Sequence, residues 1–461
     1  MGQDGVQKLL GGLRGDALRA RAMRGSMLTV VSFGGRNALR LGSNLILTRI
    51  LFPEAFGLMA LVQVFLTGLQ MFSDFGVNAS VIRSKRGDDP GFLDTAWTVQ
   101  VLRGVVLWLG AVALAGPAAA FYDEPQLREL LPVVGLTAIF LGLSSINIVT
   151  VNRKLVLGRL TALELGTQAL GIVVMVALAF VLQSVWALVI GGLVQAGSKA
   201  LLSHVLLPGR MARPALEPAA FGELFHFGKW IFLSTIAGFL LKHGDRAILG
   251  KYISLSDLAF YTIAFMLASM PYLLKTALLE RVLYPLYCNT PPAESPANRA
   301  KILRARMILT GGVLAISAPF VIFGPEVIRL LYDPRYHDAG PILTAIGFVW
   351  MFRIITSGHD PVLLAAGESR TFALLLICGA ALRICLMLLG AIHFGIPGVI
   401  GAALVAETLI YPVLVRLTFR YGAWDWRQDA GFACLAVLIL TLTLWRNPAV
   451  WTDFVALAGP G

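Results

Sequence analysis

Apolar segments about as long as a lipid bilayer is thick recur along almost all of this 461-residue chain. A helix rises about 1.5 Å per residue, so it needs roughly 20 mostly apolar residues to cross the hydrocarbon layer. Hydrophobic residues make up 57% of the sequence and charged residues only 14%. A soluble domain could not stay in solution with this balance, so we expect an all-α polytopic membrane protein.

The same length criterion predicts twelve membrane-spanning helices. Their expected bounds are 26–49, 55–82, 92–121, 127–151, 160–182, 184–207, 224–250, 256–287, 302–331, 339–366, 370–393 and 397–419. A thirteenth apolar run, 430–445, is long enough to cross if its flanking residues reach the interface, whereas 448–461 is too short to return. We therefore expect one or two further helices at the C-terminal end.

Basic residues fall in every second loop, which sets the expected topology, because cytoplasmic loops carry an excess of Lys and Arg. The excess occurs in the N-terminal segment and in loops two, four, six, eight and ten: Lys8, Arg14, Arg19, Arg21 and Arg24; Arg83, Lys85 and Arg86; Arg153, Lys154 and Arg159; Arg210 and Arg213; Arg299, Lys301, Arg304 and Arg306; and Arg370. The N-terminus is thus expected in the cytoplasm. This bias also accounts for the net charge of +12, so we expect no nucleic-acid partner.

The N-terminal segment, residues 1–25, is expected to remain on the cytoplasmic side. The first apolar run has no small-residue cleavage site and is long enough to stay as a span, so no signal peptide is expected. The segment mixes Leu and Ala with basic residues at roughly helical spacing. It is either an amphipathic helix on the inner membrane surface or a frayed tail.

A shift of 202 residues aligns the two halves of the chain. It places Arg49 on Lys251 and Phe56 on Leu258, so the first helix of each half ends in a similar way. Many transporters consist of two similar halves with the binding site between them. We expect two pseudo-symmetric six-helix bundles around a central cavity. The expected division is an N-lobe over 26–208, a cytoplasmic linker over 209–220, a C-lobe over 221–421 and a C-terminal segment over 422–461.

Two arginines one helical turn apart, Arg36 and Arg40, lie inside the first apolar stretch. A cation at mid-membrane costs at least about 2.5–3.5 kcal/mol, so the pair implies a wet interior, a counter-charge or an anionic ligand. Ser32, Ser43 and Asn44 continue the same face at helical spacing. The first helix is therefore predicted to carry a single polar stripe.

The seventh helix, which the repeat pairs with the first, carries Lys242, Asp245 and Arg246 at positions i, i+3 and i+4. Two interpretations are open. Either the stripes of both helices face one cavity and give it a cationic lining, or Asp245 neutralises Lys242 or Arg246 and the cluster holds helices together. The first interpretation makes the cavity a conduit for an anionic molecule.

Further ionisable residues lie inside the expected spans. Those near cytoplasmic ends, where side chains reach the interface or cap a helix, are Glu164, Lys199, Glu280, Arg281 and Asp360. Those at greater depth, which need a polar interior or a buried ion pair, are Arg103, Lys275, Arg353, Arg383 and Glu407. Among these, Arg383 and Glu407 could pair with each other. The carboxylates available for coupling to a proton or sodium gradient are Asp74, Asp245 and Glu407.

Motifs of several other kinds of site are absent from the sequence. The four cysteines have no CxxC spacing and no ligand-forming histidines, so we expect neither a disulfide scaffold nor a metal site. No GxxxxGK[ST] phosphate-binding loop occurs, so ATP is not expected to drive the protein directly. We expect no cofactor and no catalytic residue.

Several longer runs resemble one family. They are "SNLILTRILFPEAFGLMALVQVF" followed by "FSDFGVNASVIRSK", then "DRAILGKYISLSDLAFYTIAFML", "RVLYPLY" and "GPEVIRLLYDPRYHDAGPIL". From about Ser26 to Tyr421 the chain resembles the polysaccharide transporter family. These are the O-antigen and exopolysaccharide flippases of the multidrug/oligosaccharidyl-lipid/polysaccharide exporter superfamily. The shared motifs are Gly, Pro and apolar patterns, which specify the family but not the glycan.

This resemblance implies two lobes around a V-shaped cavity lined by helices 1, 2, 7 and 8. The cargo would be a lipid-linked (undecaprenyl-pyrophosphate) oligosaccharide, moved across a bacterial inner membrane by alternating access. Other polysaccharide assembly proteins would be its partners. The lining positions carried over are Arg36, Arg40, Asn44, Asp74, Lys242, Asp245, Arg246 and Lys275, and Arg353 is a further substrate-binding candidate. Arginine suits such a cargo because guanidinium groups bind phosphate oxygens in pairs.

Three alternatives remain open from the sequence. A drug/cation antiporter of the same superfamily would share the fold, but its site should be dominated by carboxylates and aromatic residues. A major-facilitator transporter also has twelve helices, but it should have a long central cytoplasmic loop. A membrane glycan polymerase or ligase should have large external loops, whereas the expected external loops here are short.

Overall fold

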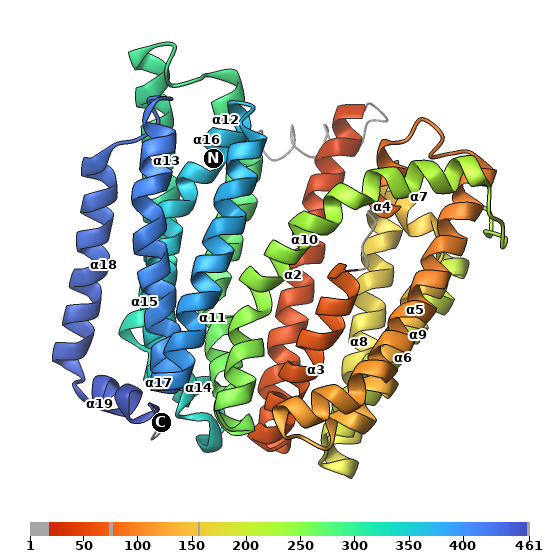
Figure 1. The fold of residues 1–461 in the computed structure, drawn as a ribbon, viewed down its shortest axis with the longest axis horizontal. Helices are drawn as coiled ribbons and strands as arrows, with labels where there is room; N and C mark the ends of the chain where they lie inside the picture. The colour runs from red at the N-terminus through yellow and green to blue at the C-terminus, as the bar shows by residue number, and fades with distance from the viewer. Residues whose placement is uncertain (1–17, 73–76, 155–156, 459–461) are drawn as a thin grey trace, which may run out of the picture. The chain divides into compact units, whose positions relative to one another are not determined.

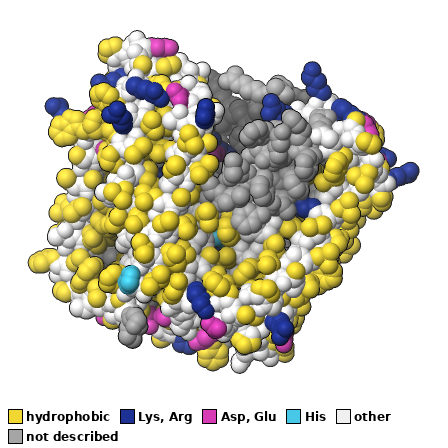
Figure 2. Space-filling model, in the orientation of Figure 1, with side chains coloured by type: hydrophobic (Ala, Val, Ile, Leu, Met, Phe, Trp, Pro, Cys, Tyr) yellow, Lys and Arg dark blue, Asp and Glu magenta, His cyan; other side chains and the backbone are white. Residues whose placement is uncertain are grey.

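The computed structural model describes residues 18–72, 77–154 and 157–458 (Figure 1). Every regular element in these ranges is a helix, which confirms the all-α expectation. Hydrophobic side chains cover much of the surface, as Figure 2 shows for one face. Val173, in the middle of an apolar helix, is 65% exposed. A chain that faced water would bury such side chains, so this surface suits contact with lipid.

The helices follow the expected spans. In chain order they are α2 (Leu18–Ile50), α3 (Pro53–Phe72), α4 (Val77–Arg83), α5 (Pro90–Tyr122), α6 (Leu127–Leu143), α7 (Asn147–Arg153), α8 (Leu157–Leu182), α9 (Val185–Leu206), α10 (Pro218–Tyr252), α11 (Leu255–Leu278), α12 (Tyr284–Asn289), α13 (Pro296–Ile322), α14 (Gly324–Leu331), α15 (Ala339–Thr356), α16 (Asp360–Ala365), α17 (Ser369–Phe419), α18 (Trp426–Arg446) and α19 (Ala449–Ala456). A π-helical turn, Leu279–Leu283, joins α11 to α12.

Nine helices within the described ranges are long and apolar enough to cross a membrane, and the bent pair α6 and α7 would make ten if it forms one span. Helices α2 and α10, which carry the charged stripes, are not among the nine. The protein is therefore a multi-pass membrane protein.

The single long element α17 consists of two arms. Gly395 breaks it with φ +54°, a left-handed backbone that favours glycine. Beyond the break the arms pack against each other, since a Cβ added at Gly398 would lie 1.9 Å from the carbonyl oxygen of Gly390. Two antiparallel helices result, as the sequence predicted with 370–393 and 397–419.

Two expected spans are interrupted. The span 55–82 contains α3 and α4, and residues 73–76 between them lie outside the described ranges. The span 127–151 bends by 57° between α6 and α7. The span 302–331 divides at Phe323, because Pro325 lacks an amide hydrogen and begins a new helix, α14.

The C-terminal region adds one helix of spanning length within the described residues. The thirteenth expected run, 430–445, lies inside α18, which is long and apolar enough to cross. The last helix, α19, has eight residues and is too short to cross. Helix α18 packs through Ala436 against α13 and α15, in a cluster that contains Leu314 and Met351.

The chain divides into two compact units. Unit 1 comprises residues 1–52 and 62–236, and unit 2 comprises 53–61 and 237–461. The boundaries fall inside α3 and α10, so each of these helices belongs to both units. The first part of α3 lies on the start of α11, where the Ser256 hydroxyl donates to Glu54 at 2.6 Å. These two residues are 202 positions apart, which is the shift that aligns the two halves of the chain. The two turns that this alignment pairs therefore contact each other.

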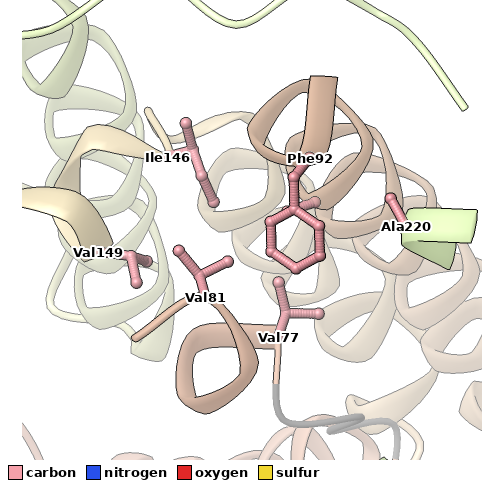
Figure 3. Packing of buried hydrophobic residues seen from close by; sticks show 7 residues of the cluster. Val77, Val81, Phe92, Ile146, Val149 and Ala220 are labelled. Atoms are coloured by element: carbon pink, nitrogen blue, oxygen red, sulfur yellow. The ribbon is translucent and has the colours of Figure 1, made fainter. Parts of the chain in front are cut away.

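A hydrophobic cluster joins the short helix α4 to its neighbours in unit 1. Val77 and Val81 pack against Phe92 of α5 and against Ile146 and Val149 at the start of α7 (Figure 3). Ala220, in the first turn of α10, completes the cluster. Burial of these side chains holds Val77–Arg83 of α4 against its neighbours.

The segment that connects α9 to α10 is held along the first turns of α5. Asp94 forms an ion pair with Arg210 and accepts the amide hydrogen of Arg213 at 2.9 Å. The hydroxyl of Thr95 accepts from the amide of Glu217 at 3.0 Å. This segment, which was predicted to be a linker, therefore contacts α5 of unit 1 from Arg210 to Glu217.

The loop before α5 adds charge pairs to this attachment. Arg86 forms an ion pair with Glu217 at 2.8 Å and donates from Nε to Asp89 at 3.0 Å. These hydrogen bonds from Arg86 hold the pKa of Asp89 below its usual value. The contact is therefore present at neutral pH, and it is lost as pH falls through the lowered pKa.

Candidate functional site

The polar stripe of α2 has a partner in unit 1. The guanidinium of Arg36 lies 3.4 Å from the carboxylate of Glu164 on α8, and the Ser32 hydroxyl donates to the same carboxylate at 3.1 Å. Arg36 thus has a counter-charge, which is one of the three conditions that the sequence required. Arg40, one turn later, is exposed, and Asn44 is half-buried. The stripe therefore keeps a surface that a ligand could contact.

The stripe of α10 has a different arrangement. The Asp245 carboxylate is buried and accepts a hydrogen bond from the Tyr261 hydroxyl at 2.7 Å. Within the described residues it forms no ion pair with Lys242 or Arg246. The interpretation that Asp245 neutralises its helix neighbours therefore does not match this geometry.

The two cations of α10 are held in distinct ways. Lys242 is exposed. The Arg246 guanidinium lies over the ring of Phe265, with its central carbon 4.2 Å from the ring centroid, and donates to the carbonyl of Lys242 at 3.2 Å. Its Nε is buried and has no hydrogen-bond partner among the described groups. Stacking on the ring fixes the guanidinium in place while a donor remains available to an acceptor.

A small cavity of unit 2 lies beside Asp245. Its lining includes Tyr261, Phe265, Trp350 and Arg353, and its volume is about 40 Å³. This volume can hold an ion or one or two water molecules but not a sugar. The cavity is therefore too small for a cargo.

Two deeper arginines of unit 2 share one carboxylate. Glu407 is buried and lies 3.5 Å from Arg383 and 3.6 Å from Arg353. The pair of Arg383 with Glu407, which the sequence suggested, is present. Arg353 also forms an ion pair with Asp360 at 3.3 Å. Two carboxylates thus neutralise Arg353, a substrate-binding candidate, within unit 2.

Lys275, another substrate-binding candidate, has no exposed surface. Its ammonium group donates to the carbonyl of Ile354 and to the Thr310 hydroxyl, the latter at 3.2 Å. In this conformation it joins α11 to α13 and α15, so a ligand would have to displace these contacts to reach it. The remaining candidate, Asp74, lies outside the described residues.

A buried charge network in unit 2 was not found from the sequence. Arg306 on α13 forms an ion pair with Asp429 on α18. Asp429 also lies 2.9 Å from the Nε2 of His359 and accepts from the Tyr411 hydroxyl at 2.9 Å. Arg306 was predicted to be a cation of a cytoplasmic loop, whereas only 2% of its side chain is exposed. The one signal in the sequence was that Arg306 also falls inside the expected span 302–331.

The polysaccharide biosynthesis protein family model matches residues 46–341, which is more than half of the chain. The chain belongs to this family. Its relatives include the teichuronic acid biosynthesis protein TuaB of Bacillus subtilis (strain 168), which is 20% identical over 77% of this chain and 72% of TuaB. The resemblance drawn from the sequence motifs is thereby confirmed.

Solved structures agree on the fold. The lipid II flippase MurJ, in an inward closed conformation, matches with a TM-score of 0.66 over 94% of this chain and 97% of MurJ, at 12% identity. An inward-facing multidrug resistance MATE family transporter of the MOP superfamily matches with a TM-score of 0.60, over 90% of this chain and 96% of that one, also at 12% identity. The fold is therefore common to flippases and drug transporters, and it does not decide between them.

Proposed function

We propose that the protein moves an undecaprenyl-pyrophosphate-linked oligosaccharide from the cytoplasmic to the periplasmic leaflet by alternating access, for surface polysaccharide assembly. The observation that carries the proposal is the pair of stripes on α2 and α10, where Arg40 and Lys242 are exposed and Arg246 keeps a buried donor. Membership of the polysaccharide biosynthesis family supports a glycan cargo. Similarity to a protein described as a lipid II flippase supports translocation.

The chemistry of the head group fits these cations. A pyrophosphate is a dense anion with several acceptor oxygens, and a guanidinium binds two of them at once. Arg246 is already held by Phe265, so less conformational entropy is lost when it binds. For net transport, the two conformations must bind the head group with different affinities, since a ligand that both bind equally does not change their relative populations.

The rival within the same fold is a drug/cation antiporter. A site for organic cations needs carboxylates that remain available. Here Glu164 has Arg36, Glu407 has Arg353 and Arg383, and Asp360 has Arg353 as a partner. Of the coupling candidates that the structure describes, Asp245 has only neutral partners. The pairing of these carboxylates with arginines leaves few of them for an organic cation, which favours an anionic cargo over a cationic one.

The direct experiment is a leaflet-resolved assay in vesicles that contain the purified protein. One arm carries a fluorescent polyprenyl-pyrophosphate-linked oligosaccharide, and the other carries a fluorescent organic cation. We expect the glycolipid to change leaflet faster than in protein-free vesicles and to keep its mass, with no movement of the cation. Movement of the cation alone would favour an antiporter, and a change of glycolipid mass would favour a polymerase or ligase.

We also propose that Asp245 binds the coupling ion, H⁺ or Na⁺. Its buried carboxylate and the adjacent 40 Å³ cavity offer an oxygen ligand and room for an ion or water. The variant Asp245→Asn keeps the side-chain shape but loses the charge. We expect that an imposed H⁺ or Na⁺ gradient no longer increases the translocation rate of this variant, measured in the same vesicles.

The control for this variant is Asp338→Asn, which removes an exposed carboxylate of unit 2. It should keep the full response to the gradient. If Asp245→Asn also kept that response, Asp245 would have no part in coupling, and the translocation proposal would stand without it.

We further propose that the protein lies in the bacterial inner membrane with its N-terminus in the cytoplasm, and that other polysaccharide assembly proteins are its partners there.

A further inference from the structure

Three aromatic side chains of unit 2 pack together beside Asp245. Tyr261 and Phe265 lie one turn apart on α11, and their ring centroids are 6.0 Å apart. Trp350 of α15 meets the Phe265 ring edge-on, with the centroids 5.6 Å apart. All three side chains line the 40 Å³ cavity that Asp245 also lines. They form one contiguous set of rings that contacts α10 at both of its neighbouring charged residues, Asp245 and Arg246.

The first of these contacts is a hydrogen bond to the carboxylate. The Tyr261 hydroxyl donates to Oδ2 of Asp245 at 2.7 Å, and the Oδ1 atom accepts the backbone amide hydrogen of Arg246 at 2.8 Å. Tyr261 is only 3% exposed, so little water competes for its hydroxyl. A hydrogen bond to an ionised acceptor is about twice as strong as one between neutral groups. An ion that neutralises Asp245 therefore weakens the hold of the carboxylate on the Tyr261 ring.

The second contact is the stacking of Arg246 on Phe265. The central carbon of the guanidinium lies 4.2 Å from the ring centroid, and the same ring packs against Tyr261 and Trp350. A cation is attracted to the face of an aromatic ring, so the attraction depends on where that face lies. The place and tilt of the Phe265 ring therefore set the direction in which the Arg246 donors point.

We infer that Phe265 is a positioning residue that transmits ion binding at Asp245 to Arg246. The inference rests on the proposed function, which assigns the ion to Asp245 and the head group to Arg246. While Asp245 is ionised, its hydrogen bond holds Tyr261, and Tyr261 keeps the Phe265 ring under the guanidinium. An ion on the carboxylate loosens these contacts, so the head group is bound less tightly. Exchange of an ion for a cargo requires such a difference in affinity.

The test is a double-mutant cycle on the full-length protein in detergent, with inorganic pyrophosphate as the probe and titration calorimetry as the measurement. Asp245→Asn stands for the ion-occupied carboxylate, because it keeps the shape without the charge. The quantity compared is the Kd with Asp245→Asn divided by the Kd without it. We expect this ratio to be at least about fivefold larger in the wild-type background than in the Phe265→Leu background. The direct effect of the Asp245 charge on pyrophosphate is common to both backgrounds and cancels.

Three further backgrounds separate transmission from a merely structural role of the ring. Phe265→Tyr keeps the ring and should keep the wild-type ratio. Phe348→Leu removes another half-buried ring of α15, which packs on Phe352, and should also keep it. Tyr261→Phe lacks only the hydroxyl that contacts Asp245, and its ratio should fall as in Phe265→Leu. This variant gives an independent result if thermal unfolding without ligand shows that Phe265→Leu does not fold.

The inference and the proposed function fail in different ways. The wild-type ratio in either Phe265→Leu or Tyr261→Phe would overturn the inference and leave the proposed cargo in place. A weaker Kd in Phe265→Leu with an unchanged ratio would overturn it too, because the ring would then only support Arg246. Absence of pyrophosphate binding by the wild type would count against the proposed cargo, and the inference would fall with it.

Discussion

Replacing Asp429 by asparagine is expected to lower the free energy of unfolding by about 3–5 kcal/mol, the usual cost of removing one member of a buried ion pair. Arg306 and His359 are both buried, and Asp429 is the carboxylate between them. Asparagine keeps the shape of the side chain but leaves the guanidinium without its counter-charge. Thermal unfolding of the solubilised protein, followed by tryptophan fluorescence, measures the loss.

Two comparisons separate this effect from a general weakening of α18. Asp425→Asn changes the half-buried residue that caps the same helix, and it should cost no more than about 1 kcal/mol. The double variant Arg306→Met with Asp429→Leu removes both charges, and it should be more stable than Asp429→Asn. If Asp429→Asn and Asp425→Asn lost equal stability, the network would not hold α18 to unit 2.

Replacing Arg246 by glutamine is expected to slow translocation of the pyrophosphate-linked glycolipid by about tenfold or more. A charged hydrogen bond contributes about 1.5–3 kcal/mol, and its loss in the transition state for transport lowers the rate accordingly. Stacking on Phe265 holds the Arg246 guanidinium in place. The leaflet-resolved assay measures the rate at a fixed amount of folded protein.

Arg246→Lys and Arg370→Gln are the matched variants. Lysine keeps the charge but loses the planar fork, so its rate should lie between those of the wild type and the glutamine variant. Arg370 is an exposed cation at the start of α17, and its loss should leave the rate within about twofold. A wild-type rate in Arg246→Gln would remove the α10 stripe from the mechanism without affecting the family assignment.

The spans could be predicted because the bilayer sets one length for every crossing helix. The break between the arms of α17 was also predictable, since Gly395 and the residues around it interrupt the apolar pattern. The bend between α6 and α7 was not, because a contact between distant residues accompanies it: the Gln100 amide of α5 donates to carbonyl oxygens where α6 ends.

The candidate site, too, could be predicted from the sequence only where its residues are close along the chain. Residues one turn apart on one helix, such as Arg36 and Arg40, can be grouped from spacing alone. Pairs between distant helices have no local signal, so Glu164 could be placed near a membrane surface but not beside Arg36. The pair of Arg383 with Glu407 was an exception, because consecutive helices pack together. Asp429 was missed because it follows the last helix to which the repeat applies.

The most direct test of the account compares two cargoes that differ only in head-group charge. Both carry the same prenyl chain and the same oligosaccharide, but one is joined through pyrophosphate and the other through an uncharged ether. In vesicles with the wild-type protein, we predict that the pyrophosphate-linked cargo changes leaflet at least about tenfold faster, because in our proposal arginine and lysine side chains bind its phosphate oxygens. Equal rates for the two cargoes, or faster movement of the uncharged one, would contradict the account.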